Sequence, residues 1–326
     1  MTINILGAGS WGLALAHLLT RNNYKVNIWS RNRNKIIKFT STRTYSKLPK
    51  YIINSKVIFT SNLSDLNFKN LTIIALPSHG VYETLKSINL LYCNLLICTK
   101  GFDPESRKLL SDLLVDNLNI SINKIAVMSG PNHAEEIVQN KPSATVIASN
   151  NDKLVSSLQL LFSSEIFRVY KTNDLIGVQV GGAIKNIISI ASGLCSSLNL
   201  GDNIIAALIT RGLHEMLSLQ KIYTLDNDTL YGLSGIGDLM ATAYSQHSRN
   251  RKFGELIGSG ITVIDAVKNI DATVEGLLAC KIVNELMICN GLNLPICTEV
   301  YNILYNNSDP KKSISNLMLR KLKNEK

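Results

Sequence analysis

Two different hydrophobic patterns divide the chain into halves. In the first half, short and nearly continuous apolar runs, many of them β-branched, alternate with amphipathic segments. Runs of this kind are typical of strands that are buried on both faces of a parallel sheet. The expected strands are 3–6, 26–29, 56–60, 71–76, 95–99, 125–129 and 144–149, and the expected helices between them are 11–21, 81–88, 105–118, 134–139 and 152–162. This alternation predicts an α/β fold with a doubly wound, Rossmann-like parallel sheet.

The pattern changes after about Tyr170, where long segments with a period near 3.6 residues replace the short runs. The clearest of them predict helices over 175–198, 203–223 and 274–290. We therefore expect a dinucleotide-binding domain over 1–175 and an all-helical substrate or catalytic domain over 176–326. No flexible linker separates the two, so we expect them to pack closely and to bind a ligand between them, at the carboxyl edge of the sheet.

Composition narrows the class of partner. The formal net charge is +10, but the basic residues are mostly dispersed and aromatic residues make up only 6%. This favours an anionic small molecule over nucleic acid. The six cysteines form no CxxC pair and no zinc-like spacing, so we expect free thiols in a reducing compartment and no metal. No apolar stretch reaches the roughly 20 residues that a bilayer-spanning helix needs. We expect a soluble cytoplasmic protein without stable membrane insertion.

A glycine motif, GAGSWG at 7–12, fits the pattern GxGxxG between the first expected strand and the first expected helix. Gly7 permits a tight turn, Gly9 leaves room for a pyrophosphate, and Gly12 allows the helix to pack on the strand. The amino end of that helix offers N–H groups and a positive dipole to the phosphates. The motif therefore predicts an NAD(P)-dependent oxidoreductase.

The end of the second expected strand bears on the choice of cofactor. An NAD enzyme usually has an Asp or Glu there for the ribose hydroxyls, whereas this chain reads WSRNR at 29–33. Arg31 offers bidentate hydrogen bonds to a 2′-phosphate. We expect NADP(H) to be preferred, with NAD(H) as the alternative cofactor and a purely surface role as the alternative for Arg31.

Eight sequence blocks occur in one order along nearly the whole chain. They are GAGSWG (7–12), LPSHG (76–80), TKGFDPES (99–106), SGPNHAEEI (129–137), GVQVGGAIKNIISIASGL (177–194), GDNIIAALITRGLHEM (201–216), GLSGIGDLMATAYSQHSRNRKFG (232–254) and VEG (274–276). In this combination the chain resembles bacterial NAD(P)-dependent glycerol-3-phosphate dehydrogenase. The resemblance implies a Rossmann domain, a helical domain and a homodimer. It also implies interconversion of dihydroxyacetone phosphate and sn-glycerol 3-phosphate, which supplies glycerol phosphate for phospholipid synthesis.

Lys185 and Asn186 lie in GGAIKN, on an otherwise apolar expected helix. Reduction of a ketone by hydride leaves an alkoxide that needs a proton donor, and a buried lysine is costly unless it is paired or used. From the residues alone, a catalytic Lys185 and a Lys185 whose head group reaches solvent both stay open. The resemblance implies that Lys185 is the general acid and base, with Asn186 beside it.

Lys100 and Asp238 are the other candidate catalytic residues. Lys100 follows an expected strand at the edge where such sheets bind ligands. The resemblance implies that Lys100 contacts the substrate and the nicotinamide region, and that Asp238 orients both lysines. Thr242, one helical turn later, shares the face of Asp238 and is a candidate member of the same network. The alternative for Asp238 is a helix N-cap after glycines.

Ser248, Arg249 and Asn250 combine the hydroxyl, guanidinium and amide groups that bind phosphate. The resemblance implies that all three hold the substrate phosphate and that Arg249 also reaches the cofactor. We expect the next two residues, Arg251 and Lys252, to lie on a solvated helix face.

The resemblance assigns the remaining site residues. It implies that Ser10, Trp11, Ala134 and Glu275 contact the cofactor, and that Gly130 and the residue at 132 contact the substrate. At position 132 the family usually has Ser or Thr, whereas this chain has Asn132, which can still donate and accept hydrogen bonds. His133 replaces a usual aromatic residue and receives no role. The family's Tyr-Leu-Pro loop is kept only in part, at 47–49.

Three other functions are weighed against this one. Other β-hydroxyacid-type dehydrogenases share the domain layout and a helix lysine but bind a carboxylate, and the motif at 248–252 argues against them. A cofactor-binding regulator without turnover would not need the set of Lys100, Lys185 and Asp238. A basic nucleic-acid binder would need clustered charge.

Overall fold

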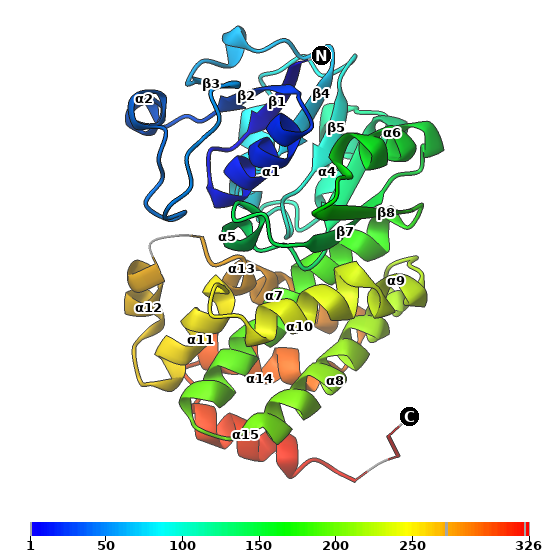
Figure 1. The fold of residues 1–326 in the computed structure, drawn as a ribbon. Helices are drawn as coiled ribbons and strands as arrows, with labels where there is room; N and C mark the ends of the chain where they lie inside the picture. The colour runs from blue at the N-terminus through cyan, green and yellow to red at the C-terminus, as the bar shows by residue number, and fades with distance from the viewer. Residues whose placement is uncertain (1, 271–272, 323, 326) are drawn as a thin grey trace.

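The structure is a computed structural model, and it describes residues 2–270, 273–322 and 324–325. A sheet domain lies above an all-helical domain, and the two chain ends lie at opposite ends of the molecule (Figure 1). The strands are β1 (Thr2–Leu6), β2 (Lys25–Trp29), β3 (Val57–Thr60), β4 (Leu71–Ile74), β5 (Asn94–Ile97), β6 (Ile125–Ser129), β7 (Ser143–Ala148) and β8 (Phe167–Thr172). The expected α/β fold followed by a helical domain is confirmed.

The sheet has the strand order β3-β2-β1-β4-β5-β6-β7-β8. The order reverses between β1 and β4, and the crevice outside such a switch point is where these sheets bind ligands. The expectation of a wholly parallel sheet is wrong at one place, because β6 and β7 pair antiparallel. Between them lies only the short helix α5 (Ala134–Ile137), whose four residues span about 6 Å. That length cannot carry the chain back along a strand.

Helices cover both faces of the sheet. One face packs α1 (Ser10–Arg21), α2 (Arg33–Thr42) and α6 (Asp152–Phe162) around side chains such as Phe39 and Phe162. The other face packs α3 (Val81–Leu85) and α4 (Leu110–Leu118) together with the start of the helical domain. The carboxyl edge of the sheet faces the helical domain, since Lys100, which follows β5, hydrogen bonds to Asp238 in that domain.

Three elements of this domain differ from expectation. Helix α2 and strand β8 were not expected. The expected helix 105–118 begins only at Leu110, because Asp103 accepts hydrogen bonds from the backbone N–H and the hydroxyl of Ser106, each at 2.8 Å. This local turn competes with the first helical turn, and Arg107 adopts a φ of 61°.

The helical domain surrounds α7 (Leu175–Ser197), which is almost wholly buried. The helices around it are α8 (Asp202–Ser218), α9 (Asn227–Tyr231), α10 (Asp238–Tyr244), α11 (Arg249–Gly258), α12 (Val263–Ile270), α13 (Glu275–Asn290), α14 (Pro295–Tyr305) and α15 (Pro310–Met318). The expected helix 203–223 is shorter, since α8 ends at Ser218 and a 3-10 turn follows.

Helix α7 corrects the expectation about apolar length. By length and composition it could cross a membrane. However, 94% of its most apolar window is buried inside the molecule, as in the core helix of a globular domain.

Small residues let α11 approach α7 closely. A Cβ on Gly193 would lie 1.9 Å from the carbonyl oxygen of Arg251, and a Cβ on Gly254 would lie 2.0 Å from the carbonyl oxygen of Ile190.

The six cysteines are free, and five of them are buried, with Cys289 exposed. The expectation of free thiols is confirmed.

Candidate active site

The glycine motif forms the turn between β1 and α1. Gly7 has a φ of 119°, and a Cβ there would lie 2.3 Å from the carbonyl oxygen of Ala75, just beyond β4. A Cβ on Gly12 would lie 2.0 Å from the carbonyl oxygen of Gly7, so the helix needs glycine to approach the strand. At Gly9 a Cβ would meet nothing within 4 Å. The turn is therefore open at Gly9, which leaves space for a ligand to approach its backbone.

Features around this turn fit a dinucleotide. The first N–H groups of α1, from Ser10 onwards, have no partners within the helix and are free to bind phosphate oxygens. The indole Nε1 of Trp11 is buried and has no hydrogen-bond partner among the described residues. Arg31 follows β2 and is exposed, and no carboxylate occurs at 30–34. Ala134, at the start of α5, is buried.

Lys100, Lys185 and Asp238 meet where the two domains join. Lys185 Nζ donates to Asp238 Oδ1 and to Thr242 Oγ1, both at 2.6 Å. Lys100 Nζ donates to Asp238 Oδ2 at 2.6 Å and to the carbonyl oxygen of Gly130 at 3.0 Å. One carboxylate thus holds two ammonium groups, one from each domain. Lys100 follows β5 in the sheet domain, and Figure 1 shows α7 and α10, which supply Lys185 and Asp238, directly below that domain.

Both open alternatives for this cluster can be compared with the structure. The Lys185 side chain is only 7% exposed, so its head group does not reach solvent. The N-cap of α10 is Gly237, and Asp238 is the first helical residue, with its carboxylate directed at the lysines instead of at the helix end.

Small residues allow this cluster to close. A Cβ on Gly181 would lie 2.4 Å from the carbonyl oxygen of Ser234, in the π-helical turn Leu233–Gly237 that leads into α10. A Cβ on Gly182 would lie 2.9 Å from Ser129 Oγ and 3.4 Å from Lys100 Cγ. The two glycines of GGAIKN therefore make room for Asp238 and Lys100 to reach Lys185.

Burial sets the protonation behaviour of the cluster. It lowers the pKa of Lys185 to about 7; the charge of Lys100 lowers it as well, while Asp238 opposes both. Burial alone would raise the pKa of Asp238, but the two neighbouring ammonium groups hold it below its usual range. A lysine with a pKa near neutrality can both give and take a proton.

The phosphate-binding candidates lie at the amino end of α11. Ser248 is the N-cap and accepts the N–H of Arg251 at 3.2 Å. The side chain of Asn250 donates to Asn186 Oδ1 at 2.8 Å and accepts the N–H of Gly276 at 3.0 Å. Both polar ends of Asn250 are thus used within the protein, and Asn186 points to Asn250 and not to the lysines.

Arginines 249 and 251 differ in their surroundings. Arg249 is exposed. The expectation that Arg251 lies on a solvated face is wrong, because Arg251 donates to Ser196 Oγ at 3.1 Å and pairs with Glu255 at 2.9 Å. Close packing of α11 on α7 brings it there. Lys252 is exposed, as expected.

Asn132 presents a buried acceptor. Its Nδ2 donates to Ser143 Oγ at 3.1 Å and to the carbonyl oxygen of Ala144 at 2.9 Å. A carbonyl can only accept, so this contact fixes the orientation of the amide. Asn132 Oδ1 is buried and has no partner among the described residues.

Three further residues around this site have no role that the sequence alone predicts. Ser129 Oγ lies 3.5 Å from Asp238 Oδ2. His133 Nε2 lies 3.3 Å from the carbonyl oxygen of Ala241, on the helix that carries Asp238, and burial lowers the pKa of this histidine. Ser78 hydrogen bonds to Glu275 at the start of α13. All three lie in the sequence blocks at 76–80 and 129–137, but only their tertiary contacts single them out.

Comparison with known proteins identifies the family. The N-terminal domain of NAD-dependent glycerol-3-phosphate dehydrogenase matches residues 2–155, and its C-terminal domain matches residues 174–315. This chain belongs to that family.

Individual relatives are similar to this chain along nearly its whole length. The glycerol-3-phosphate dehydrogenase [NAD(P)+] of Clostridium botulinum is 40% identical over 99% of this chain and 98% of its own. The enzyme of Fusobacterium nucleatum is 36% identical with the same coverage. The crystal structure of glycerol-3-phosphate dehydrogenase from Coxiella burnetii superimposes with a TM-score of 0.92 at 34% identity, over 98% of this chain and 99% of that one.

Membership of the glycerol-3-phosphate dehydrogenase family confirms the resemblance seen in the sequence and makes the chain an NAD(P)-dependent oxidoreductase. It also argues against the three alternative primary functions, namely another β-hydroxyacid-type dehydrogenase, a regulator without turnover and a nucleic-acid binder. The choice between NADP and NAD is not made by family membership, because the relatives' names include both.

Proposed function

We propose that this chain interconverts dihydroxyacetone phosphate and sn-glycerol 3-phosphate in the cytoplasm and so supplies glycerol phosphate for phospholipid synthesis, with Lys185 as the general acid and base. The observation that carries the proposal is the pair of lysines on one buried aspartate at the edge of a dinucleotide-binding sheet. NAD(P)H, when bound, supplies the hydride. The protein must therefore hold the ketone and provide the proton.

Hydrogen-bond capacity indicates how the lysines do this. An ammonium group has three N–H donors, and the contacts described above use two on each of Lys185 and Lys100. The third donor of each is available to the carbonyl oxygen of the substrate. In the reducing direction, Lys185 gives a proton to this oxygen as negative charge develops on it, and Lys185 becomes a neutral amine. Lys100 stays charged and stabilises the same oxygen.

The substrate phosphate is placed at the amino end of α11. Arg249 supplies a charged fork, and the first backbone N–H groups of the helix, including that of Asn250, supply further donors. Ser248 begins this helix, and Asn186 fixes the side chain of Asn250. Gly130 and Asn132 lie on the sheet side of the lysines. We assign the unpartnered Asn132 Oδ1 to a substrate hydroxyl, which can donate to it.

The cofactor is placed along the glycine turn, with its pyrophosphate at Gly7, Gly9, Ser10 and Gly12 and at the indole N–H of Trp11. Arg31 reads the 2′-phosphate, which favours NADP(H) over NAD(H). Ala134, Arg249 and Glu275 complete the contacts nearer the nicotinamide.

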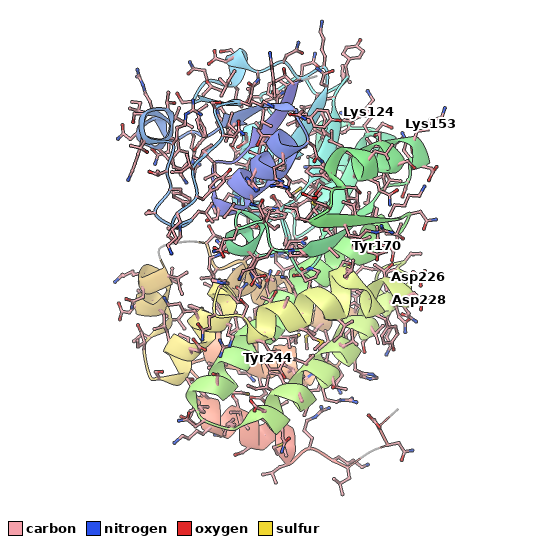
Figure 2. All side chains as sticks on the ribbon, in the orientation of Figure 1. Lys124, Lys153, Tyr170, Asp226, Asp228 and Tyr244 are labelled. Carbon is pink, nitrogen blue, oxygen red and sulfur yellow. The ribbon has the colours of Figure 1, made fainter. Side chains whose placement is uncertain are left out.

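A soluble homodimer completes the proposal. Exposed apolar and aromatic side chains support a contact surface between subunits. Tyr170 on β8 and Tyr244 at the end of α10 are both about half exposed and lie on the face seen in Figure 2. Met240, also on α10, is 49% exposed.

The test is a spectrophotometric assay with dihydroxyacetone phosphate and either NADPH or NADH. We expect turnover with both and a higher kcat/KM with NADPH. Arg31→Asp should lower kcat/KM for NADPH selectively, because it removes a charge-assisted pair and adds repulsion. An unchanged NADPH-to-NADH ratio in this variant would show that Arg31 does not read the 2′-phosphate.

A further inference from the structure

A hydrogen-bonded pair bridges the two domains close to Lys100. Ser78 lies in the 3-10 turn Ser78–Gly80 beyond β4, and Glu275 is the first residue of α13. Ser78 donates twice to the same carboxylate: its backbone N–H lies 3.1 Å from Oε1, and its hydroxyl lies 2.7 Å from Oε2. Ser78 is fully buried, while Glu275 is half-buried. Two donors from one buried residue fix the plane of this carboxylate.

The pair borders the space between the glycine turn and the lysines. Gly101 directly follows Lys100 and has a φ of 152°, and a Cβ there would lie 3.1 Å from Glu275 Oε2 and 3.4 Å from the Cβ of Ser78. Ser78 lies just beyond the end of β4. Ala75, the first residue after β4, packs against Gly7 of the glycine turn. The carboxylate thus stands where a cofactor lying on the glycine turn would bring its reacting ring to Lys100.

The chemistry of this carboxylate limits what it can bind. An ionised carboxylate is purely an acceptor, with about four lone-pair sites, and Ser78 occupies two of them. Glu275 forms no ion pair with any residue in the described part of the chain. Its remaining acceptor sites need an N–H or O–H donor, and the donor on a nicotinamide ring is the N–H group of its carboxamide.

We propose that Ser78 is a positioning residue that aims the Glu275 carboxylate at the carboxamide N–H of the nicotinamide. The ring would then be held by its carboxamide in the rotation that presents one face to the substrate. This inference rests on the proposed role of Glu275 in cofactor binding. It adds a residue, Ser78, whose effect is exerted only through Glu275.

The test compares the oxidised cofactor with its 3-acetylpyridine analogue in the oxidation of glycerol 3-phosphate. The analogue keeps the carbonyl group but has a methyl group in place of the amide nitrogen, so it offers no N–H to Glu275. Ser78→Ala removes the hydroxyl and keeps the backbone N–H. We expect the dissociation constant of the normal cofactor, measured by fluorescence titration, to rise about 3- to 10-fold, the worth of one hydrogen bond, and kcat/KM to fall by a similar factor. Both values for the analogue should change much less. Equal losses for both cofactors would overturn the proposal.

Two further variants separate positioning from a merely structural link. The cofactor preference is the ratio of kcat/KM for the normal cofactor to kcat/KM for the analogue. Glu275→Gln should reduce this preference, and adding Ser78→Ala to Glu275→Gln should not change it further. Glu285→Gln is the matched control, because Glu285 also ties α13 to the sheet domain, through Arg107 at 2.7 Å. It should leave the preference unchanged, and a shift like that of Ser78→Ala would overturn the proposal.

The outcomes also separate the role of Glu275 from that of Ser78. If Glu275→Gln leaves the preference unchanged, the cofactor role of Glu275 fails, and the role of Ser78 with it. If Glu275→Gln changes the preference and Ser78→Ala does not, the role of Ser78 alone fails.

Discussion

At the scale of single residues, the site depends on one buried carboxylate shared by two cations. Asp238 is 2% exposed and bonds to lysines from both domains. Loss of either lysine leaves the aspartate with less compensation, while loss of the aspartate leaves two ammonium groups facing each other. The geometry of the proposed proton transfer and the stability of the domain junction therefore depend on the same carboxylate.

Replacing Lys185 with Met tests the proton-transfer role. Methionine keeps most of the apolar stem and removes the ammonium group. We expect kcat for reduction of dihydroxyacetone phosphate to fall about 10²- to 10⁴-fold, the usual contribution of general acid–base catalysis. Cofactor affinity, measured by fluorescence titration, should persist. Near-normal turnover would contradict the assignment.

The pH dependence follows from the lowered pKa of Lys185. Reduction needs the ammonium form, so kcat/KM for dihydroxyacetone phosphate should decline as the pH rises through about 7. Oxidation of glycerol 3-phosphate needs the neutral amine, so its kcat/KM should decline as the pH falls through the same range.

Lys100→Gln is the control for this profile. The charge of Lys100 lowers the pKa of Lys185, so its removal should move both limbs to higher pH, whatever the loss in absolute rate. Limbs that stay in place in Lys100→Gln would belong to another group, such as the substrate phosphate.

At the scale of elements, glycines decide how closely the helices of the site approach. Where helices α7 and α11 cross, Gly193 of α7 lies against the backbone of α11, and Gly254 of α11 lies against the backbone of α7. This crossing places the amino end of α11, with its phosphate-binding candidates, against the helix that carries Lys185.

Gly254→Ala should disturb this crossing. Its Cβ would lie 2.0 Å from the carbonyl oxygen of Ile190, and backbone cannot move aside as a flexible side chain can. We expect a loss of about 1–3 kcal/mol in the free energy of unfolding, visible as a lower Tm. Gly80→Ala is the control, since a Cβ there would meet nothing within 4 Å. Equal Tm values for the two variants would contradict the packing argument.

Some of these helices and strands could be predicted from the sequence, and others could not. All seven strands expected from apolar runs are present, because a strand buried on both faces needs a nearly continuous apolar sequence. Strand β8 is an edge strand with alternating exposure, and its run FRVYKT is too polar to stand out. Helix α2 buries only Ile36 and Phe39, so its periodicity was too weak to detect.

At the scale of the whole molecule, the proposed substrate contacts come from both domains. The phosphate candidates lie in the helical domain, while Lys100 and the cofactor turn belong to the sheet domain. The energy of phosphate binding can therefore be used to bring the domains together around the ketone.

Arg249→Ala tests this coupling. We expect kcat/KM for dihydroxyacetone phosphate to fall roughly 10- to 100-fold, and that for unphosphorylated dihydroxyacetone, a very poor substrate from the start, to change little. Lys252→Ala is the control, because Lys252 is exposed on the same helix, and it should lower kcat/KM for neither substrate strongly. Arg251 is unsuitable as a control because it contacts Ser196 and Glu255. Equal losses for both substrates in Arg249→Ala would assign Arg249 a structural or purely cofactor-related role.

The sequence by itself determined the class of fold, the place of the cofactor turn and the family, because hydrophobic periodicity and ordered motifs are local properties of the chain. It also named Lys100, Lys185 and Asp238, but it left open whether Lys185 was buried and whether Asp238 capped a helix. The tertiary structure decided both, since the answer depends on packing between segments 53 and 138 residues apart. It likewise decided that Arg251 is paired, that Asn250 is held by Asn186, and that Ser78 faces Glu275 across 197 residues of chain. Contacts of this kind leave no periodic trace in a sequence, because each partner is fixed only by the fold that brings it into place.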